Sequence, residues 1–200
     1  MWVDKTADVP VVDISPLAGE DAAAIAEVAR SWDAAMSSLG LVAITGHGVP
    51  DDVAGQLASA SHDFFGFSQQ EKMQSCLHRG YGHGGFVPIG VEAVARSTAT
   101  GADKPPDLVE NIVFSHGGDP ALEAVMPAQP ASLQPAVATY WSAAEKVLRI
   151  LMRLSALALG LPADFFTPYF AAPKCNLRLA YYPEVTRPIS ANLTHLAWLN

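Results

Sequence analysis

The stretch CNLRLAYYP, residues 175–183, carries the most regular short-period pattern of the chain. Leucine or tyrosine occupies every second position, as Leu177, Leu179 and Tyr181. The positions between them hold Arg178, Ala180 and Tyr182. Successive side chains of a strand point to opposite faces, and a proline lacks the N–H that a central strand needs. We therefore predict a β-strand over residues 177–182 that ends at Pro183.

Upstream of this strand, the sequence alternates between short apolar runs and helical periodicity. We predict further strands over residues 9–15, 41–45 and 107–114, of which the second reads as buried. A first helix carries apolar residues at helical spacing and stops at Gly40, where a left-handed residue is expected. A second helix begins near Asp51 and turns Val53, Leu57, Ala60 and Phe64 inward.

Ser68 and Glu71 have the spacing of a capping box, which predicts a third, short helix that runs to Leu77. The strongest helix is predicted over residues 137–159, where Gly160 and Pro162 stop it. Its apolar stripe consists of Val137, Tyr140, Trp141, Ala144, Val147, Leu148, Leu151 and Leu154. A helical turn is expected within residues 163–170, whereas residues 80–90 and 116–134 read as irregular.

These elements define an α+β chain in which the helix of residues 137–159 packs across a small sheet that includes residues 177–182. About four strands are expected, and a jelly roll needs about eight, so no barrel closes within these residues. The apolar stripe of the long helix would then be partly exposed. We therefore expect a chain of marginal stability, or one that self-associates through this surface.

Composition restricts the classes of function. The 200 residues carry a net charge of −8, which argues against binding along a nucleic-acid backbone. The first ten residues lack a basic region followed by an apolar one, so no secretory signal is expected there. The longest apolar stretch contains Arg149 and Arg153, which argues against a membrane span. Cys76 and Cys175 form no disulfide framework, so free thiols in a reducing cytoplasm are expected.

Seven segments, in this order, resemble the N-terminal region of the isopenicillin N synthase-like, Fe(II)- and 2-oxoglutarate-dependent oxygenases. They are VPVVDISPL (9–17), LGLVAITGHGVP (39–50), FFGFSQQEK (64–72), RGYGHGGFVPIGVE (79–92), KPPDLVENIVF (104–114), LALGLPADFF (157–166) and LRLAYYP (177–183). The resemblance implies the helical N-terminal part of a double-stranded β-helix, or jelly roll, whose barrel is incomplete here. Residues 1–183 would form this region, and residues 184–200 a divergent tail.

The resemblance also implies a chemistry. Such enzymes oxidise small-molecule metabolites with an iron that two histidines and one carboxylate hold, and most of them use 2-oxoglutarate. The isopenicillin N synthase branch uses no 2-oxoglutarate, so the cosubstrate stays open. In the family an H-x-D motif follows the YYP strand, then a distant histidine, then an arginine and a serine that bind 2-oxoglutarate.

The last 17 residues depart from that pattern. His195 is the one histidine after the strand, and Ala197 stands where the carboxylate belongs. We therefore expect a truncation, a frame change or a fragment that does not bind iron by itself. His195 is the weak candidate for an iron ligand. The alternative function is that of a catalytically inactive fragment or scaffold that only binds a partner.

Among the remaining residues, Tyr182 and Arg178 are the candidates for binding 2-oxoglutarate, because the resemblance places the second tyrosine of YYP near the keto acid. The family has an asparagine at the position of Ala180, so one contact is missing. Cys76, His78 and His83 offer only three ligands for zinc, and a surface loop is the preferred interpretation. His47 is expected to bond to the backbone after its strand, whereas His62 and His116 are expected to be solvated.

Overall fold

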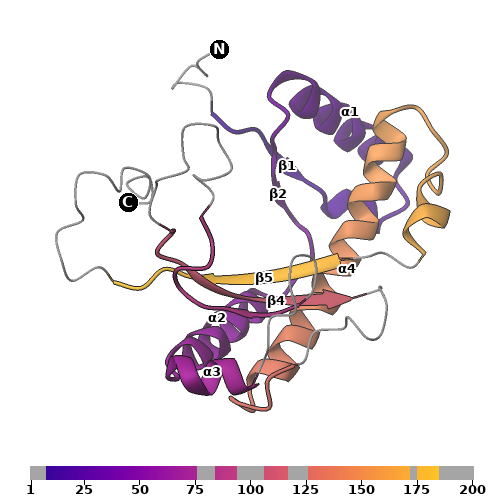
Figure 1. Cartoon of the computed structure of the whole chain (residues 1–200). Helices are drawn as coiled ribbons and strands as arrows, with labels where there is room; N and C mark the ends of the chain where they lie inside the picture. The colour runs from indigo at the N-terminus through magenta and orange to yellow at the C-terminus, as the bar shows by residue number, and fades with distance from the viewer. Residues whose placement is uncertain (1–7, 76–83, 94–105, 117–125, 172–174, 185–200) are drawn as a thin grey trace. The chain divides into compact units, whose positions relative to one another are not determined.

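A computed structural model describes residues 8–75, 84–93, 106–116, 126–171 and 175–184 (Figure 1). The chain divides into two compact units, one of residues 1–55 and 137–173 and the other of residues 56–136 and 174–200. The described residues form an α+β chain with two separate sheets, in the orders β1-β2 and β3-β4-β5. These strands do not close into a barrel, as the sequence predicts.

The first unit is built around a short parallel pair of strands. Its elements are β1 (Val11–Asp13), the 3-10 helix η1 (Ser15–Ala18), α1 (Ala22–Ser38), β2 (Ala43–Thr45), the larger part of α4 (Leu133–Ala158) and the 3-10 helix η4 (Thr167–Phe170). Val12 pairs with Ile44 in the β1–β2 ladder. The buried core of this unit consists of Val12, Ile14, Leu17, Val28, Ala29 and Leu154.

The second strand of this pair is less buried than the sequence predicts. β2 spans only Ala43–Thr45, and of these residues only Ile44 is half-buried while Ala43 and Thr45 are exposed. In β1, Val12 is 5% exposed and its neighbour Val11 is 65% exposed. The expectation of a buried strand was wrong because only one face of this two-stranded sheet packs on the core, so alternate residues face outward.

Asp21 caps the N-terminus of α1. Its Oδ1 accepts hydrogen bonds from the N–H groups of Ala23, at 2.9 Å, and of Ala24, at 3.2 Å. Because these donors have no partner inside the helix, we expect Asp21→Ala to lower the free energy of unfolding by about 1 kcal/mol. Urea denaturation measures the difference, and Asp21→Asn, which keeps the acceptor oxygen, serves as the control. An equal loss in both variants would contradict the capping role.

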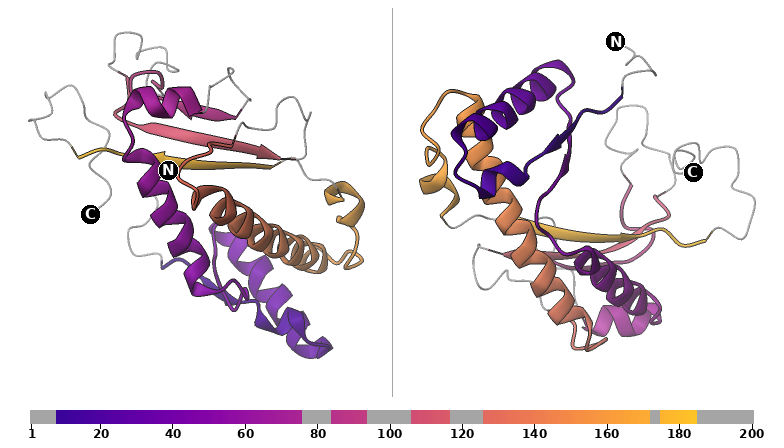
Figure 2. Two further views of the ribbon diagram at one scale, coloured as in Figure 1. Left: turned by 90° about the horizontal axis from the view of Figure 1, so that it is seen from below. Right: turned by 180° about the vertical axis from the view of Figure 1, so that it is seen from behind.

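The second unit holds an antiparallel sheet with two helices. Its elements are most of α2 (Asp51–Phe65), α3 (Gln69–Ser75), β3 (Gly85–Val87), β4 (Glu110–His116) and β5 (Cys175–Tyr181). Figure 2 shows β4 and β5 side by side and running in opposite directions. The prediction for the inner side of α2 is confirmed, because all four residues expected there are buried: Val53, Leu57, Ala60 and Phe64.

The capping box before α3 is present. The Ser68 N–H donates to Glu71 Oε2 at 2.9 Å, and the Glu71 N–H donates to Ser68 Oγ at 3.3 Å. The hydrogen bond from the Ser68 hydroxyl, and then the one from its N–H, holds the pKa of the Glu71 carboxyl below its usual value. A lowered carboxyl pKa means that the box stabilises the helix at neutral pH and that this contribution is lost as the pH falls through the folded pKa. The predicted extension of α3 to Leu77 lies outside the described residues.

Strand β3 lies within the stretch that the sequence assigns to irregular structure. It comprises Gly85, Phe86 and Val87, and Phe86 pairs with Ile112 of β4. The prediction missed it because glycines precede the strand and Pro88 follows it, so the local pattern is that of a loop. Only the pairing with β4 makes these three residues a strand. The described chain therefore has five strands in two sheets, where about four strands in one sheet were expected.

The long helix is confirmed as α4, but it begins at Leu133, four residues before the predicted start. Pro135 falls in its first turn, where a proline is tolerated because the N–H has no helical partner. Within the first unit, Ile150, Leu151 and Leu157 pack against the core that β1, η1 and α1 form. Of the predicted stripe, Val137 and Leu154 are buried, whereas Tyr140, Trp141, Val147, Leu148 and Leu151 are half-buried, as expected. No helix in the described ranges is long and apolar enough to cross a membrane.

Candidate functional site

The two faces of the β3-β4-β5 sheet have different chemistry. Ladder pairing places Phe86, Ile112 and Leu179 on one face, together with Glu110 and Tyr181. Phe64 of α2 contacts Phe86 edge to face at a centroid distance of 6.0 Å. Phe65 stacks on Tyr181 at 5.2 Å. This covered face is therefore the core of the second unit.

A buried ion pair fixes β4 to α3 on the covered face. Lys72 Nζ donates to both carboxylate oxygens of Glu110, at 2.7 and 2.8 Å, and to the carbonyl oxygen of Phe65 at 3.1 Å. The ammonium also lies 5.3 Å from the ring centroid of Phe86. Lys72 is 4% exposed and Glu110 6%. The pair sets the position of the strand residue that follows Glu110, which is Asn111.

The opposite face carries most of the uncharged polar groups of the sheet, and we call it the polar face. It consists of Asn111 and Ser115 of β4, Asn176, Arg178 and Ala180 of β5, and the apolar Val87 and Val113. Asn111 pairs with Ala180, Val113 with Arg178, and Ser115 with Asn176. The predicted alternation of residues 177–182 is confirmed, because Leu177, Leu179 and Tyr181 are half-buried while Arg178, Ala180 and Tyr182 are exposed.

Asn111 is the residue of the polar face that sequence reasoning missed. Its side chain is 0% exposed, and within the described residues neither its Oδ1 nor its Nδ2 has a hydrogen-bond partner. The same holds for Ser115 Oγ on the same face of β4. Native structures pair nearly all buried polar atoms. The available signal was an asparagine directly before the apolar residues Ile112 and Val113 in the predicted strand, where strand propensity disfavours it.

Of the two candidates for 2-oxoglutarate, Arg178 lies on this face and is already paired. The guanidinium of Arg178 donates to Glu92 Oε2 at 2.6 Å, with the two side chains 46% and 26% exposed. Tyr182 lies one residue beyond the end of β5 and is 55% exposed. The structure thus brings Arg178 next to a carboxylate, which balances its charge, and leaves the ring of Tyr182 open to solvent.

The other predicted sites fall into two groups. His195, Cys76, His78 and His83 lie outside the described residues, as does the side chain of His116. His47 is confirmed as a structural residue, since its Nδ1 accepts a hydrogen bond from the N–H of Val49 at 3.1 Å. His62 is exposed as expected, and its ring also meets Tyr181 edge to face at 6.3 Å. Cys175 is a free thiol.

The side chains that could ligate a non-haem iron do not form a group in the described residues. The described part of the chain contains no group of three or more His, Cys, Asp or Glu side chains that could hold a metal ion. In the sequence, none of the six histidines is followed two positions later by Asp or Glu. A facial iron site needs two histidines and a carboxylate. The described residues therefore do not make an iron centre by themselves.

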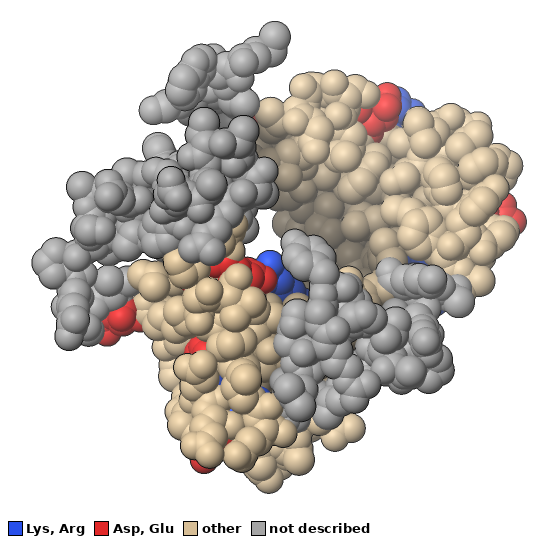
Figure 3. Space-filling model, in the orientation of Figure 1, with Lys and Arg blue, Asp and Glu red and all other residues tan. Residues whose placement is uncertain are grey.

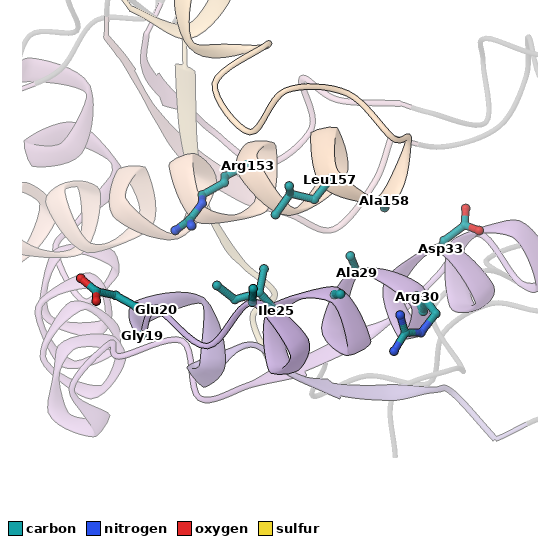
Figure 4. A pocket seen from close by; sticks show the side chains of 11 residues that line it. Gly19, Glu20, Ile25, Ala29, Arg30, Asp33, Arg153, Leu157 and Ala158 are labelled. Atoms are coloured by element: carbon teal, nitrogen blue, oxygen red, sulfur yellow. The ribbon is translucent and has the colours of Figure 1, made fainter.

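A cavity of about 600 Å³ lies in the first unit between α1 and α4 (Figure 4). Ile25 and Ala29 of α1 face Leu157 of α4 across it. Arg153 lies at one end, where its Nη1 donates to the Leu17 carbonyl at 3.0 Å. The lining also includes the charged residues Glu20, Arg30 and Asp33, and Figure 4 shows the carboxylates of Glu20 and Asp33 at opposite ends of the cavity.

Comparisons with known proteins identify the fold class and the family of this chain. The fold resembles that of a putative 2OG-Fe(II) oxygenase family protein from Caulobacter crescentus, with a TM-score of 0.77 and 21% identity over 94% of this chain and 61% of that chain. This likeness defines the fold class as that of the non-haem oxygenases. Residues 9–133 match the family model described as non-haem dioxygenase in morphine synthesis N-terminal, and the chain belongs to this family.

Curated relatives cover the same region. The chain is 28% identical over 196 residues to homoarginine-6-hydroxylase 2-ODD-233 of Oryza sativa subsp. japonica, which covers 89% of this chain and 57% of that protein. It is 26% identical over 191 residues to validamycin A dioxygenase of Streptomyces hygroscopicus subsp. limoneus, which covers 90% of this chain and 51% of that protein. The chain thus spans about half the length of the curated relatives that it matches.

Proposed function

We propose that this chain is the N-terminal region of an Fe(II)- and 2-oxoglutarate-dependent oxygenase that oxidises a small-molecule metabolite. The observation that supports it most is the family match over residues 9–133, together with a fold that aligns with an oxygenase over 94% of this chain. The names of the relatives describe enzymes that hydroxylate or oxidise small molecules. The polar face of the β3-β4-β5 sheet is the ligand-binding surface in this proposal.

The proposal divides the chain at Pro183. Residues 1–183 supply the helical support and the first strands of the double-stranded β-helix, and residues 184–200 form a separate tail. The proposed iron ligands lie outside the described residues, because these contain no group of three side chains that could hold a metal ion. This division is supported by the end of family-like sequence at the YYP strand.

Tyr182 and Arg178 are the proposed contacts for 2-oxoglutarate. Arg178 lies on the face of β5 opposite the covered face, and Tyr182, exposed like Arg178, follows the end of β5 directly. Arg178 donates to Glu92 already, so a dianionic keto acid has to compete with that carboxylate for the guanidinium. Tyr182 is 55% exposed, so its hydroxyl is the more available donor of the two.

The proposed partner is a small molecule and not a nucleic acid. On the face drawn in Figure 3, the described charged side chains are scattered among uncharged ones and form no extended basic patch. The net charge of −8 opposes binding along a phosphate backbone. A cytoplasmic location is proposed from the free thiol of Cys175. Self-association through the half-buried stripe of α4 remains a prediction.

Iron binding tests this proposal. Residues 1–200 alone, reconstituted anaerobically with Fe(II) and 2-oxoglutarate, are expected to hold far less than one iron per chain and to release no succinate. One imidazole, that of His195, does not replace the three ligands that select iron. The measurements are metal content after desalting and succinate released on admission of air.

The comparison sample is a longer protein that contains residues 1–200 followed by an H-x-D motif and a distant histidine. It is expected to bind one iron per chain and to convert 2-oxoglutarate to succinate. Failure of that longer protein to do so would contradict the proposed function. One tightly held iron in residues 1–200, lost in His195→Ala, would instead show that the chain builds a metal site of its own.

A further inference from the structure

We propose that Asn111 is a specificity-determining residue that binds a neutral ligand group in which an N–H donor lies beside a C=O acceptor, as in a carboxamide or a lactam. The inference rests on the proposed function only in calling this ligand the substrate of the oxygenase. It follows from the burial of the Asn111 amide, the chemistry of its neighbours and the charge balance of the polar face.

The first observation is energetic. Asn111 is 0% exposed, and neither atom of its amide has a hydrogen-bond partner within the described residues. Each buried polar group without a partner destabilises a fold, so such groups are rare in native structures unless they have a role. An apolar side chain at this strand position would pack without that loss. The sequence nevertheless places an amide there.

The second observation is the identity of the neighbours. In the ladder, Asn111 lies between Val87 of β3 and Ala180 of β5, and the next residue on the same face of β4 is Val113. None of these three side chains has a hydrogen-bonding atom. Ala180 is also small, so β5 offers the amide no polar partner at this position. A partner for the amide therefore has to come from outside these three side chains.

The chemistry of the amide then selects the ligand. Asparagine presents one acceptor oxygen and one NH₂ donor side by side in a plane. A group with an N–H next to a C=O satisfies both atoms through two parallel hydrogen bonds. A ketone satisfies only the NH₂, and a carboxylate does the same while facing the amide oxygen with negative charge. The neutral donor–acceptor edge is therefore the best complement.

Charge balance at the polar face favours a neutral ligand as well. Arg178, which pairs in register with Val113, is bound to Glu92 at 2.6 Å. Its charge is balanced by Glu92, or by the keto acid that the proposed function places there, so no free cation is left for a second anionic group beside Asn111. Ser115, with an unpartnered Oγ, lies on the same face about 13 Å along β4, at roughly 3.3 Å per residue. A ligand that reached both residues would lie along the strand over Val113.

The experiment uses residues 1–200 without metal, labelled with ¹⁵N, and follows the side-chain NH₂ resonances of Asn111 during titration with 2-pyrrolidinone, a cyclic lactam. N-methyl-2-pyrrolidinone, which lacks the N–H, and cyclopentanone are the matched probes. The lactam is expected to shift the Asn111 resonances in a saturable manner and to bind at least tenfold more tightly than either matched probe. Equal affinities for the three probes would overturn the proposal, and this comparison needs no variant.

Two variants test whether the lactam binds through the side chain of Asn111. Asn111→Leu is expected to weaken lactam binding at least tenfold and to unfold at a temperature equal to or higher than that of the parent chain. Gln70→Leu, which removes an exposed side-chain amide of α3 away from the polar face, is expected to keep the parent affinity. Undiminished lactam binding by Asn111→Leu would overturn the proposal. Neither iron nor 2-oxoglutarate is present, so a failure to release succinate in the earlier experiment leaves this outcome unaffected.

Discussion

Replacing Lys72 by alanine is expected to lower the free energy of unfolding by about 3–5 kcal/mol, because it leaves the carboxylate of Glu110 buried without its cation. Glu110 is only 6% exposed, and both of its oxygens accept from Lys72 Nζ. A domain of this size is typically stable by about 5–15 kcal/mol, so the variant is expected to be partly unfolded near physiological temperature. Urea denaturation followed by circular dichroism measures the change.

Two comparisons test the physical reason. The double variant Lys72→Met with Glu110→Leu removes both charges, and it is expected to recover most of the lost stability because apolar residues of similar volume replace a buried pair with little net effect. The control is Arg30→Ala, which removes one partner of the exposed Arg30–Glu27 pair, where about 1 kcal/mol or less is expected. A double variant as unstable as Lys72→Ala would refute the explanation.

Gly46→Ala is the second change with a large expected effect, a loss of about 2–5 kcal/mol from backbone strain and overpacking together. Gly46 has a φ of +66°, in the left-handed region that disfavours a side chain. An added Cβ would overlap Asp13 Oδ1 and lie 2.9 Å from the backbone N of Ser15. That methyl group would displace Asp13, whose Oδ1 accepts from the Ser15 N–H at 2.9 Å.

Gly40 and Gly48 provide the matched controls for this prediction. Their φ angles are +69° and +71°, and an added Cβ would meet nothing within 4 Å at either position. Gly40→Ala and Gly48→Ala therefore carry the strain of the left-handed conformation without the clash, and about 1–2 kcal/mol is expected for each. If all three variants lose the same stability in thermal or urea denaturation, the close approach to Asp13 has no energetic role.

Lys72 also affects the polar face, because it holds the strand that carries Asn111. Glu110 precedes Asn111 in β4, so the buried pair holds the strand that presents the candidate recognition residue. Any substrate specificity at the polar face then depends on a contact between residues 38 positions apart in the sequence. We therefore expect Lys72, in the short helix α3, to influence a site that it does not touch.

Local sequence patterns determined the elements of the chain. Alternation over residues 177–182, helical spacing over residues 137–159 and the capping box of Ser68 and Glu71 each depend on neighbours a few residues apart, and the structure confirms all three. Gly40 likewise takes the left-handed conformation expected at the end of α1. Periodicity reports such features directly, because a strand repeats every two residues and a helix about every 3.6.

Tertiary structure alone decided the rest. The three residues of β3 form a strand only because β4 pairs with them, and the two-sheet arrangement follows from pairings that local patterns do not encode. The candidate site depends on the register that places Asn111 between Val87 and Ala180. In the sequence, Asn111 is a polar residue between Glu110 and the apolar run that begins at Ile112. It becomes a recognition group because the ladder fixes apolar neighbours on both sides of it, and a buried amide can satisfy its hydrogen bonds only with what lies within a few ångströms.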